Sequence, residues 1–355
     1  MADLLIIPFH CLVLCARDQL EHFPPHERLS QEIITRDLVG DARRDLHAIV
    51  YAELRHRLGL KLSLGQRVAV AVDDAWQKQQ LAALATNQGA QVIELQGNTP
   101  TLVQATPTDP IDALRAAWKG ITIVGDLHGD LHALTTALTW AQARQNFVWF
   151  LGDVIDYGDG TLEAADAVYR TVMQGTAAMI IGNHERKIAK WLDQRENGRP
   201  HLRISAANQV TIEALDALKP AARKQWIGRF RSLLSHASLI QQIGNMTLLH
   251  AAAHPTLWGT APDYMLIEQF ALYGEADHSG GKFRRVHRWI DAVPEGQMVF
   301  VGHDVMSEFP IIVTGAKGGR VVFLDTGCGT GGHLSTADLR FSPAGLRLEC
   351  FNRIT

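Results

Sequence analysis

Short apolar runs alternate with helix-like segments in the first part of the chain. Runs that predict buried strands occupy residues 4–15, 67–72 and 91–95. Apolar residues at helical spacing occupy residues 40–58 and 75–88. This alternation is typical of an α/β domain. From 97 to 110 the chain is rich in Pro, Thr and Asp, and the signals for helix and strand lapse, so we expect a domain boundary there.

Strand-like runs recur in the second part of the chain, and each ends at polar residues. They occupy 121–125, 147–152, 177–182, 246–250, 298–302 and 321–325, with helical segments between the first three. In α/β sheets the loops beyond the carboxyl ends of strands converge on one edge, so we expect functional groups there. The block from about 201 to 235 differs and predicts two helices, the second opened by Pro220.

Composition narrows the class of protein. A chain of 355 residues predicts about two domains. Its hydrophobic content of 46% and formal charge of -3 argue against disorder and against broad electrostatic binding to nucleic acid or to an anionic membrane. No apolar run reaches the roughly 18–20 residues of a membrane span, and the opening run is interpreted as a strand rather than a signal sequence. The four cysteines form no metal-binding spacing, which favours reduced thiols and a cytoplasmic location.

The polar residues at the strand ends are the candidate chemistry. They are Asp126, His128, Asp153, Asp156, Asn183, His184, His250 and His303. One such residue alone is more often a turn cap or a histidine satisfied by hydrogen bonds. Together they form a mixed carboxylate, imidazole and amide set that suits Mn²⁺, Fe²⁺, Zn²⁺ or Ni²⁺. A pair of ions about 3.5–4 Å apart needs a bridging ligand, and Asp153 is the candidate bridge.

The motifs that carry these residues resemble those of a known family. GDLHG (125–129), GDVIDYG (152–158), GNHE (182–185), His250 and GH (302–303) are similar, in order and spacing, to the motifs of calcineurin-like metallophosphoesterases, in the branch that contains the phosphoprotein phosphatases. The resemblance covers about 118–355. It implies a metallophosphoesterase β-sandwich flanked by helices.

The resemblance also implies roles for the residues. Asp126, His128 and Asp153 would hold one divalent ion. Asp153, Asn183, His250 and His303 would hold the other. A hydroxide held by the ions would attack phosphorus, with His184 as general acid oriented by Asp156.

One position departs from the phosphatase pattern. The family has an arginine after the second Asp, where it grips the substrate phosphate, and this chain has Tyr157. A tyrosine offers one hydrogen bond but neither a positive charge nor a bidentate fork. The cation could come instead from Arg186, Lys282, Arg284 or Arg285, although a solvated basic face is an equally good interpretation of the last three.

A second resemblance extends toward both ends of the chain. LDTGCGTGGHL (324–334) is similar to the C-terminal part of the bacterial RNA-repair polynucleotide kinase-phosphatase, which implies that Asp325 supports the site from behind the ligands. Residues 1–96 resemble the kinase domain of that family without its G-x-x-x-x-G-K-[ST] phosphate loop. We therefore expect 1–110 to be a smaller, degenerate α/β domain like a P-loop kinase, with its linker. Residues 111–355 would form the metallophosphoesterase domain, with a helical insertion at about 201–235.

The predicted activity is that of a dinuclear phosphatase with two divalent transition metal ions, Mn²⁺ first among them. Its predicted substrate is a phosphomonoester, which could be a small nucleotide, a nucleic-acid end or a phosphoprotein. The loss of the gripping arginine at Tyr157 favours an alternative, a dinucleoside polyphosphate or phosphodiester hydrolase. A non-catalytic scaffold is the remaining alternative, and the oligomeric state is left open.

Overall fold

The computed structural model describes most of the second part of the chain and part of the first. The described residues are 11–15, 28–29, 54, 58, 62, 68–72, 78, 81–82, 85, 90–96, 99–104, 110–196, 198, 202–258, 264–277, 284–342 and 345–354. The chain divides into two compact units, Met1–Ala113 and Leu114–Thr355. Within the described residues, no helix is both long and apolar enough to cross a membrane.

The first unit contains a five-stranded sheet in the order β2-β3-β1-β4-β5. Its strands are β1 (Cys11–Cys15), β2 (Arg28–Leu29), β3 (Val68–Ala71), β4 (Gln91–Gln96) and β5 (Thr99–Gln104). All neighbours are parallel except β4 and β5, which form an antiparallel pair. The predicted strands at 67–72 and 91–95 are confirmed, as is the described part of the run at 4–15.

The expectation that strand signals lapse over 97–110 was wrong. Residues 99–104 form β5, which pairs with β4 as an antiparallel hairpin. Thr99, Thr101 and Val103 are β-branched and stand at alternate positions, which suits a strand. Pro100 hid this pattern, but a proline is tolerated in an edge strand, and β5 lies at the sheet edge.

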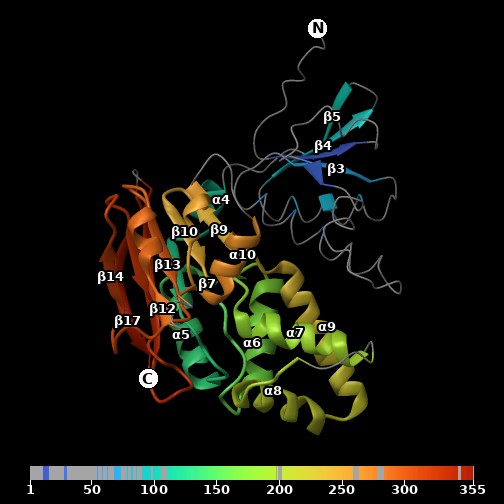
Figure 1. The fold of residues 1–355 in the computed structure, drawn as a ribbon, viewed down its shortest axis with the longest axis vertical. Helices are drawn as coiled ribbons and strands as arrows, with labels where there is room; N and C mark the ends of the chain where they lie inside the picture. Colours follow the sequence, from blue (N-terminus) through green and yellow to red (C-terminus); the bar gives the residue numbers. More distant parts are fainter. Residues whose placement is uncertain are drawn as a thin grey trace. The chain divides into compact units, whose positions relative to one another are not determined.

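The second unit contains two mixed five-stranded sheets, and Figure 1 shows their strands in the green to red part of the ribbon. One sheet has the order β17-β16-β6-β7-β8 and the other β14-β15-β13-β10-β9. The strands of the first are β6 (Gly120–Val124), β7 (Asn146–Phe150), β8 (Ala177–Met179), β16 (Leu334–Ser342) and β17 (Gly345–Ile354). Those of the second are β9 (Ile240–Ile243), β10 (Met246–Leu249), β13 (Met298–Val301), β14 (Ile311–Thr314) and β15 (Arg320–Phe323). The six predicted strands of this region are confirmed, and so is the mixed α/β fold class.

Helices and a small hairpin complete the second unit, and the first of these helices spans the division between Ala113 and Leu114. The helices are α4 (Pro110–Ala117), α5 (Leu131–Ala143), α6 (Thr161–Met173), α7 (Asn183–Glu196), α8 (Ala206–Ala217), α9 (Pro220–His236), η3 (Pro255–Trp258), α10 (Tyr264–Tyr273) and η5 (Arg288–Ala292). Strands β11 (Glu275–Asp277) and β12 (Arg284–Val286) form an antiparallel pair.

The two helices predicted within 201–235 are α8 and α9, and Pro220 stands at the first turn of α9 as expected. A capping box between Ser205 and Asn208 begins α8. Helices α6 to α9 gather together in Figure 1 and share one apolar core. Leu162, Ile212 and Trp226 are among its buried members. The helical block is therefore packed as a unit beside the strand ends.

Parallel pairing brings the strand ends together. β6, β7 and β8 are parallel to one another, and so are β10, β13 and β15. Their carboxyl ends are followed by the loops that carry the candidate residues. This topology positions five loops for one site.

Candidate metal centre

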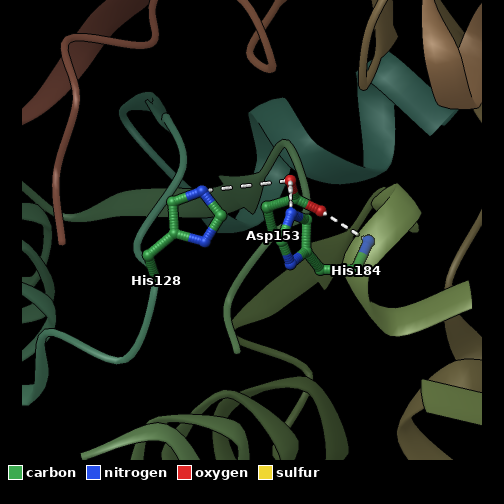
Figure 2. Close-up of side chains that lie close together, drawn as sticks. All are labelled: His128, Asp153 and His184. Atoms are coloured by element: carbon green, nitrogen blue, oxygen red, sulfur yellow. Dashed lines mark hydrogen bonds and ion pairs between the residues drawn. The ribbon is translucent and has the colours of Figure 1, made fainter. Parts of the chain in front are cut away.

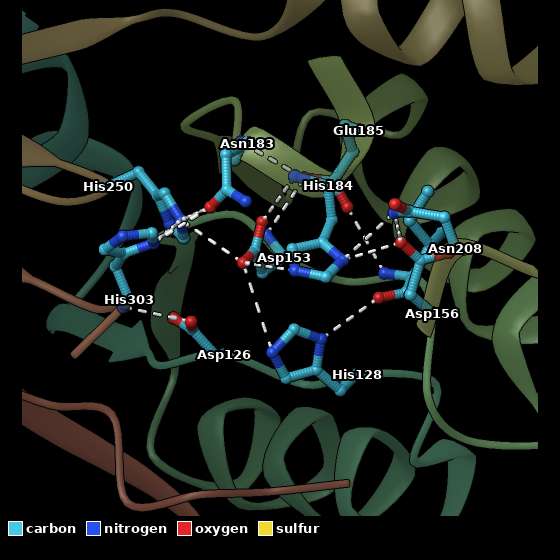
Figure 3. Close-up of polar contacts among 12 residues, drawn as sticks. Asp126, His128, Asp153, Asp156, Asn183, His184, Glu185, Asn208, His250 and His303 are labelled. Atoms are coloured by element: carbon cyan, nitrogen blue, oxygen red, sulfur yellow. Dashed lines mark hydrogen bonds and ion pairs between the residues drawn. The ribbon is translucent and has the colours of Figure 1, made fainter. Parts of the chain in front are cut away.

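The strand-end residues predicted from the sequence meet in one cluster, and Figure 3 shows their polar contacts. They come from the loops after β6 (Asp126, His128), β7 (Asp153, Asp156), β8 (Asn183, His184), β10 (His250) and β13 (His303). Asp126, His128, Asp153, Asp156 and His250 are buried.

The carboxylate of Asp153 lies at the centre of the cluster. Its Oδ2 is 3.3 Å from His250 Nε2 and 3.8 Å from His184 Nε2. His128 Nε2 lies 4.0 Å from the same oxygen. Figure 2 shows His128 and His184 beside this carboxylate. One oxygen atom therefore faces three imidazoles from three different loops.

Among the described residues, two triads have donor atoms that could share an ion. They are His128, Asp153 and His184, and Asp153, His250 and His303, with all donor atoms of a triad within 4.8 Å of one another. Asp153 belongs to both. That arrangement suits the bridging role predicted for it, because a carboxylate can offer one oxygen to each of two ions.

The second triad is completed by an amide oxygen. Asn183 Oδ1 lies 2.8 Å from His250 Nε2 and 2.9 Å from His303 Nδ1. The two imidazole nitrogens are 3.2 Å apart. His250 Nδ1 faces the carbonyl oxygen of Leu151 at 2.8 Å, so a neutral His250 carries its proton there and turns a lone pair toward the amide oxygen. Lone pairs that face one another at these distances are stabilised by a bound cation or by a proton on one of the nitrogens.

His128 is oriented in the same way. Its Nδ1 lies 3.1 Å from the carbonyl oxygen of Ile155, which fixes the proton on that nitrogen and directs Nε2 toward Asp153. A backbone acceptor behind the ring is the usual support of a metal-binding histidine.

Asp126 is a buried carboxylate with incomplete hydrogen bonding. Its Oδ2 accepts a hydrogen bond from the backbone N–H of His303 at 3.0 Å. Its Oδ1 is buried and has no hydrogen-bond partner among the described residues. Burial, then Asp325 and Asp153, raise the pKa of Asp126 well above its ordinary value. An unpaired buried carboxylate costs free energy that a bound cation would offset, so the residues present suit a metal.

Burial and the charges of the cluster also shift the pKa values of its other titratable groups. Burial alone would raise the pKa of Asp153, but His250 and His184 outweigh it and hold that pKa well below its usual range. For His250 burial acts downward, yet Asp153 leaves its pKa raised. Burial and the neighbouring His250 lower the pKa of His303 to about 3, which keeps this imidazole neutral and able to bind a metal.

His184 is held from behind by Asp156. Its Nδ1 lies 2.6 Å from Asp156 Oδ2, and its backbone N–H donates to Asp153 Oδ1 at 3.0 Å. Burial acts to lower the pKa of His184, but Asp153 and the hydrogen bond with Asp156 raise it to about 9. A histidine in this state can carry a proton at neutral pH.

Comparison with known proteins agrees with this geometry. Residues 120–307 match the family described as Calcineurin-like phosphoesterase. The chain belongs to this family. It is therefore an enzyme of the phosphoesterase class, and the predicted resemblance is confirmed at that level.

Two relatives of this phosphoesterase carry the name bis(5'-nucleosyl)-tetraphosphatase PrpE (asymmetrical). The protein from Geobacillus sp. is 25% identical over 233 residues, which are 59% of this chain and 88% of that protein. The protein from Halalkalibacterium halodurans is 27% identical over 235 residues, 62% of this chain and 89% of that protein. A solved metallophosphoesterase from Sphaerobacter thermophilus is 17% identical, with a TM-score of 0.42, and the match covers 67% of this chain and 88% of that one.

The sequence analysis gave no role to Glu185, although this residue ends the GNHE motif and could have been found from it. This side chain is buried in the phosphoesterase site and accepts four backbone N–H groups. They belong to Asp153, Val154, Ile155 and Gly182, at 2.8–3.2 Å. The carboxylate thus ties the loops after β7 and β8 together.

The loop that Glu185 holds is strained. Asp153, Asp156 and Tyr157 have φ of 48°, 76° and 60°, a region that residues other than glycine seldom adopt. Strain of this kind persists only where the surroundings impose it, and it is common at functional sites.

The candidate substrate contacts of the phosphoesterase differ in their surroundings. Tyr157 is 43% exposed, and its ring centroid lies 4.7 Å from that of His128 and 5.6 Å from that of His184. Arg186 Nη2 lies 3.0 Å from Glu268 Oε1, so this guanidinium is engaged in an ion pair. Whether either residue contacts substrate stays a prediction.

The basic residues near β12 also differ in whether their charge is already paired. Arg285 Nη1 donates to Asp304 Oδ1 at 2.7 Å and to the carbonyl oxygen of His303 at 3.2 Å. Arg284 is exposed on the same strand. Lys282 lies outside the described residues. Arg285 therefore stands at the edge of the cluster but is already paired.

Asp325, to which the second resemblance assigned a supporting role, follows β15. It is buried, and its Oδ1 accepts the backbone N–H of Gly327 at 2.9 Å. Its charge acts on Asp126 and on His128. The Nδ1 atom of His254, four residues after His250, lies 2.8 Å from Thr256 Oγ1, and His254 is in neither triad.

Proposed function

We propose that this phosphoesterase hydrolyses the phosphoanhydride bonds of dinucleoside polyphosphates. Two observations support this proposal over the phosphomonoesterase activity first expected from the sequence. The relatives that match most of their own length are named as bis(5'-nucleosyl)-tetraphosphatases. Tyr157 stands beside His128 and His184 in the position where the phosphatases have a phosphate-gripping arginine.

The proposal depends mainly on the presence of Tyr157 in place of an arginine, because the two classes of substrate differ in the negative charge of the phosphate that is attacked. A terminal phosphate carries between one and a half and two negative charges near neutral pH. An internal phosphate of a polyphosphate chain carries one. Arg186 and Arg285 are engaged with Glu268 and Asp304, which leaves less positive charge to balance a terminal phosphate. A singly charged internal phosphate makes the smaller demand.

We propose that two divalent transition metal ions complete the site. As the family resemblance implies, Asp126, His128 and Asp153 would hold one ion, although the donor atoms of Asp126 belong to neither triad. Asp153, Asn183, His250 and His303 would hold the other. When bound, such ions supply a water of lowered pKa and neutralise the charge that develops on the phosphoryl oxygens. Mn²⁺ suits these ligands, as do Fe²⁺, Zn²⁺ and Ni²⁺.

The side chain that would supply a proton to the leaving group is His184. His184 is held through Nδ1 by Asp156, so its Nε2 is the atom that can protonate the leaving oxygen. This pair also keeps a second candidate function open, hydrolysis of phosphomonoesters of nucleotides, nucleic-acid ends or phosphoproteins. The alkoxide that leaves from a monoester is a strong base and needs such a proton more than a departing nucleotide does.

We also propose the domain assignment made from the sequence. Residues 1–110 would be a degenerate kinase-like domain and linker, related to the RNA-repair polynucleotide kinase-phosphatase, and 111–355 the hydrolase domain. The parallel strands β1 to β4 are consistent with that origin. Without a phosphate loop, no phosphoryl transfer from ATP is expected. The cytoplasmic location stays a prediction from the cysteine pattern.

A metal-by-substrate comparison tests the function. Purified protein loaded with Mn²⁺, Fe²⁺, Zn²⁺ or Ni²⁺ would be assayed on diadenosine tetraphosphate, a nucleoside monophosphate, a 5'-phosphorylated oligonucleotide and a phosphopeptide. We expect kcat/KM for the tetraphosphate to exceed that for each monoester by about tenfold or more, a difference of about 1.4 kcal/mol. Faster hydrolysis of a monoester would favour the second function. No activity with any ion would favour the scaffold alternative.

A further inference from the structure

Asp156, which holds His184, is itself held by helix α8. Asp156 is fully buried. The hydroxyl of Thr211 donates to its Oδ1. The side-chain amide of Asn208 donates to its Oδ2, the oxygen that also faces His184 Nδ1 (Figure 3). Thr211 and Asn208 are buried as well. Neither residue was singled out from the sequence, since α8 lies more than fifty positions after Asp156.

A closed ring of hydrogen bonds fixes the direction of the Thr211 hydroxyl. The backbone N–H of Asp156 donates to Thr161 Oγ1 at 2.9 Å. Thr161 Oγ1 and Thr211 Oγ1 are 2.8 Å apart. Because Thr211 gives its proton to the carboxylate, Thr161 must be the donor to Thr211, and each hydroxyl is then used once as donor and once as acceptor. The ring leaves no freedom to rotate away from Asp156.

The amide of Asn208 is fixed by the start of its own helix. Ser205 Oγ donates to Asn208 Oδ1 at 2.6 Å, within the capping box of α8. With the oxygen directed at Ser205, the NH₂ group is directed at Asp156. The same side chain thus begins the helix and supports the carboxylate.

Helix α8 is in turn held by the apolar core of the helical block. Ile212 and Leu215 on α8 are buried with Trp226 of α9 and Leu162 of α6. A shift of α8 would therefore move the two groups that hold Asp156, and through it the ring of His184.

We propose that α8 is a positioning element of the reaction, in which Thr211 and Asn208 fix Asp156 so that His184 donates its Nδ1–H to Asp156 and presents its Nε2–H to the leaving group. This inference rests on the proposed role of His184 as proton donor. It makes Thr211 and Asn208 positioning residues, which touch neither substrate nor metal.

Thr211→Val removes the hydroxyl with little change in volume and is the decisive variant, because Asn208 also caps α8. The proposal predicts a larger loss on a substrate whose leaving group needs a proton. We expect kcat on phenyl phosphate to fall about tenfold more than kcat on 4-nitrophenyl phosphate, the usual scale for support behind a catalytic group. Thr211→Ser should restore the ratio. Thr247→Val is the matched control, since Thr247 is also buried but its hydroxyl has no hydrogen-bond partner among the described residues.

A second measurement does not depend on activity. The ¹H shift of the His184 Nδ1–H, assigned by loss of the signal in His184→Gln, reports the hydrogen bond that this group donates to Asp156. Wild-type protein and Thr211→Ser should show this proton far downfield, and Thr211→Val should show it shifted upfield or broadened by exchange.

The outcomes separate this proposal from the proposed function. An equal loss on both phosphates, no loss, or a wild-type Nδ1–H without a downfield shift would each overturn the positioning role. A wild-type protein that hydrolyses neither phosphate would count against the second candidate function, phosphomonoester hydrolysis, and the Nδ1–H shift would still decide on the network. If Thr211→Val fails to fold, the wild-type Nδ1–H shift and Thr161→Val, which breaks the same ring, decide instead.

Discussion

His250 and Asn183, which follow two different strands, bring Nε2 and Oδ1 to within 2.8 Å of each other. The proton of a neutral His250 lies on the far side of the ring, against Leu151. With a neutral His250 the contact pairs two acceptors, and either a proton on Nε2 or a bound cation relieves their repulsion.

Metal binding should accordingly stabilise the protein. Addition of Mn²⁺ at one hundred times its Kd should raise the free energy of unfolding by about 2.7 kcal/mol for one site. Thermal unfolding of chelator-treated protein, with and without Mn²⁺, measures the change, and elemental analysis should give about two equivalents per chain. In Asp153→Ala the stabilisation and all hydrolysis should disappear, because both ions lose a ligand. A full Mn²⁺ response in that variant would contradict the shared site.

Gly302 allows Asp126 to occupy its position. A Cβ at residue 302 would lie 1.9 Å from Asp126 Oδ1, far inside van der Waals contact. Gly302→Ala should displace this carboxylate and weaken metal retention roughly 10- to 100-fold. Metal titration followed by activity measures the loss.

The matched control, Gly228→Ala, should stabilise the protein rather than weaken metal binding. Gly228 is exposed within α9, and a Cβ there would meet nothing within 4 Å. Gly228→Ala should raise the free energy of unfolding by about 0.5–1 kcal/mol and leave metal binding unchanged. Equal behaviour of the two variants would show that space at residue 302 is not the reason for its glycine.

Tyr157→Arg should shift the substrate preference toward terminal phosphates. A guanidinium beside His128 and His184 would add the charge and the bidentate fork that Tyr157 lacks. The ratio of kcat/KM for a monoester to that for diadenosine tetraphosphate should rise about tenfold, since one charge-assisted hydrogen bond contributes about 1.5 kcal/mol or more. Tyr157→Phe should leave the ratio close to wild type. A ratio that does not move in Tyr157→Arg would show that another residue decides the preference.

The fold and the cluster were predictable where the signal was local. The apolar runs that became β6, β7, β10 and β13 each end at a polar motif, and those motifs are short and ordered along the chain. The strand β5 was missed because Pro100 obscures its alternation, and only pairing with β4 makes it a strand.

Contacts between residues far apart in the chain could not be predicted from the sequence. Thr211 meets Asp156 across 55 positions, and Arg186 meets Glu268 across 82. A threonine or glutamate on a helix surface is ordinary until packing shows what it faces. The opposing charge that occupies Arg186 could not be inferred from its position after GNHE.

A substitution of Glu185 tests whether a residue in the site acts by stabilising the structure or by taking part in the reaction. Its carboxylate accepts N–H groups from Asp153, Val154, Ile155 and Gly182, so it has no oxygen free for substrate or metal. Glu185→Gln replaces one acceptor by an NH₂ group that would face backbone donors. Burial and the neighbouring Asp153 raise the pKa of Glu185 to about 7, so the comparison is made above that pH, where the carboxylate is ionised. Because hydrogen bonds to a charged group contribute about 1.5–3 kcal/mol, the free energy of unfolding should then fall by about 2–3 kcal/mol.

Chemical denaturation of Glu185→Gln measures this loss, with Glu163→Gln as control. Glu163 is exposed in the first turn of α6, where loss of its charge should cost less than about 1 kcal/mol. Metal affinity should fall with stability in Glu185→Gln, since the loop that carries Asp153 loosens. If hydrolysis were lost while stability and metal affinity stayed at the wild-type level, Glu185 would have to act on the substrate itself, and its place behind the strained loop would no longer explain its role.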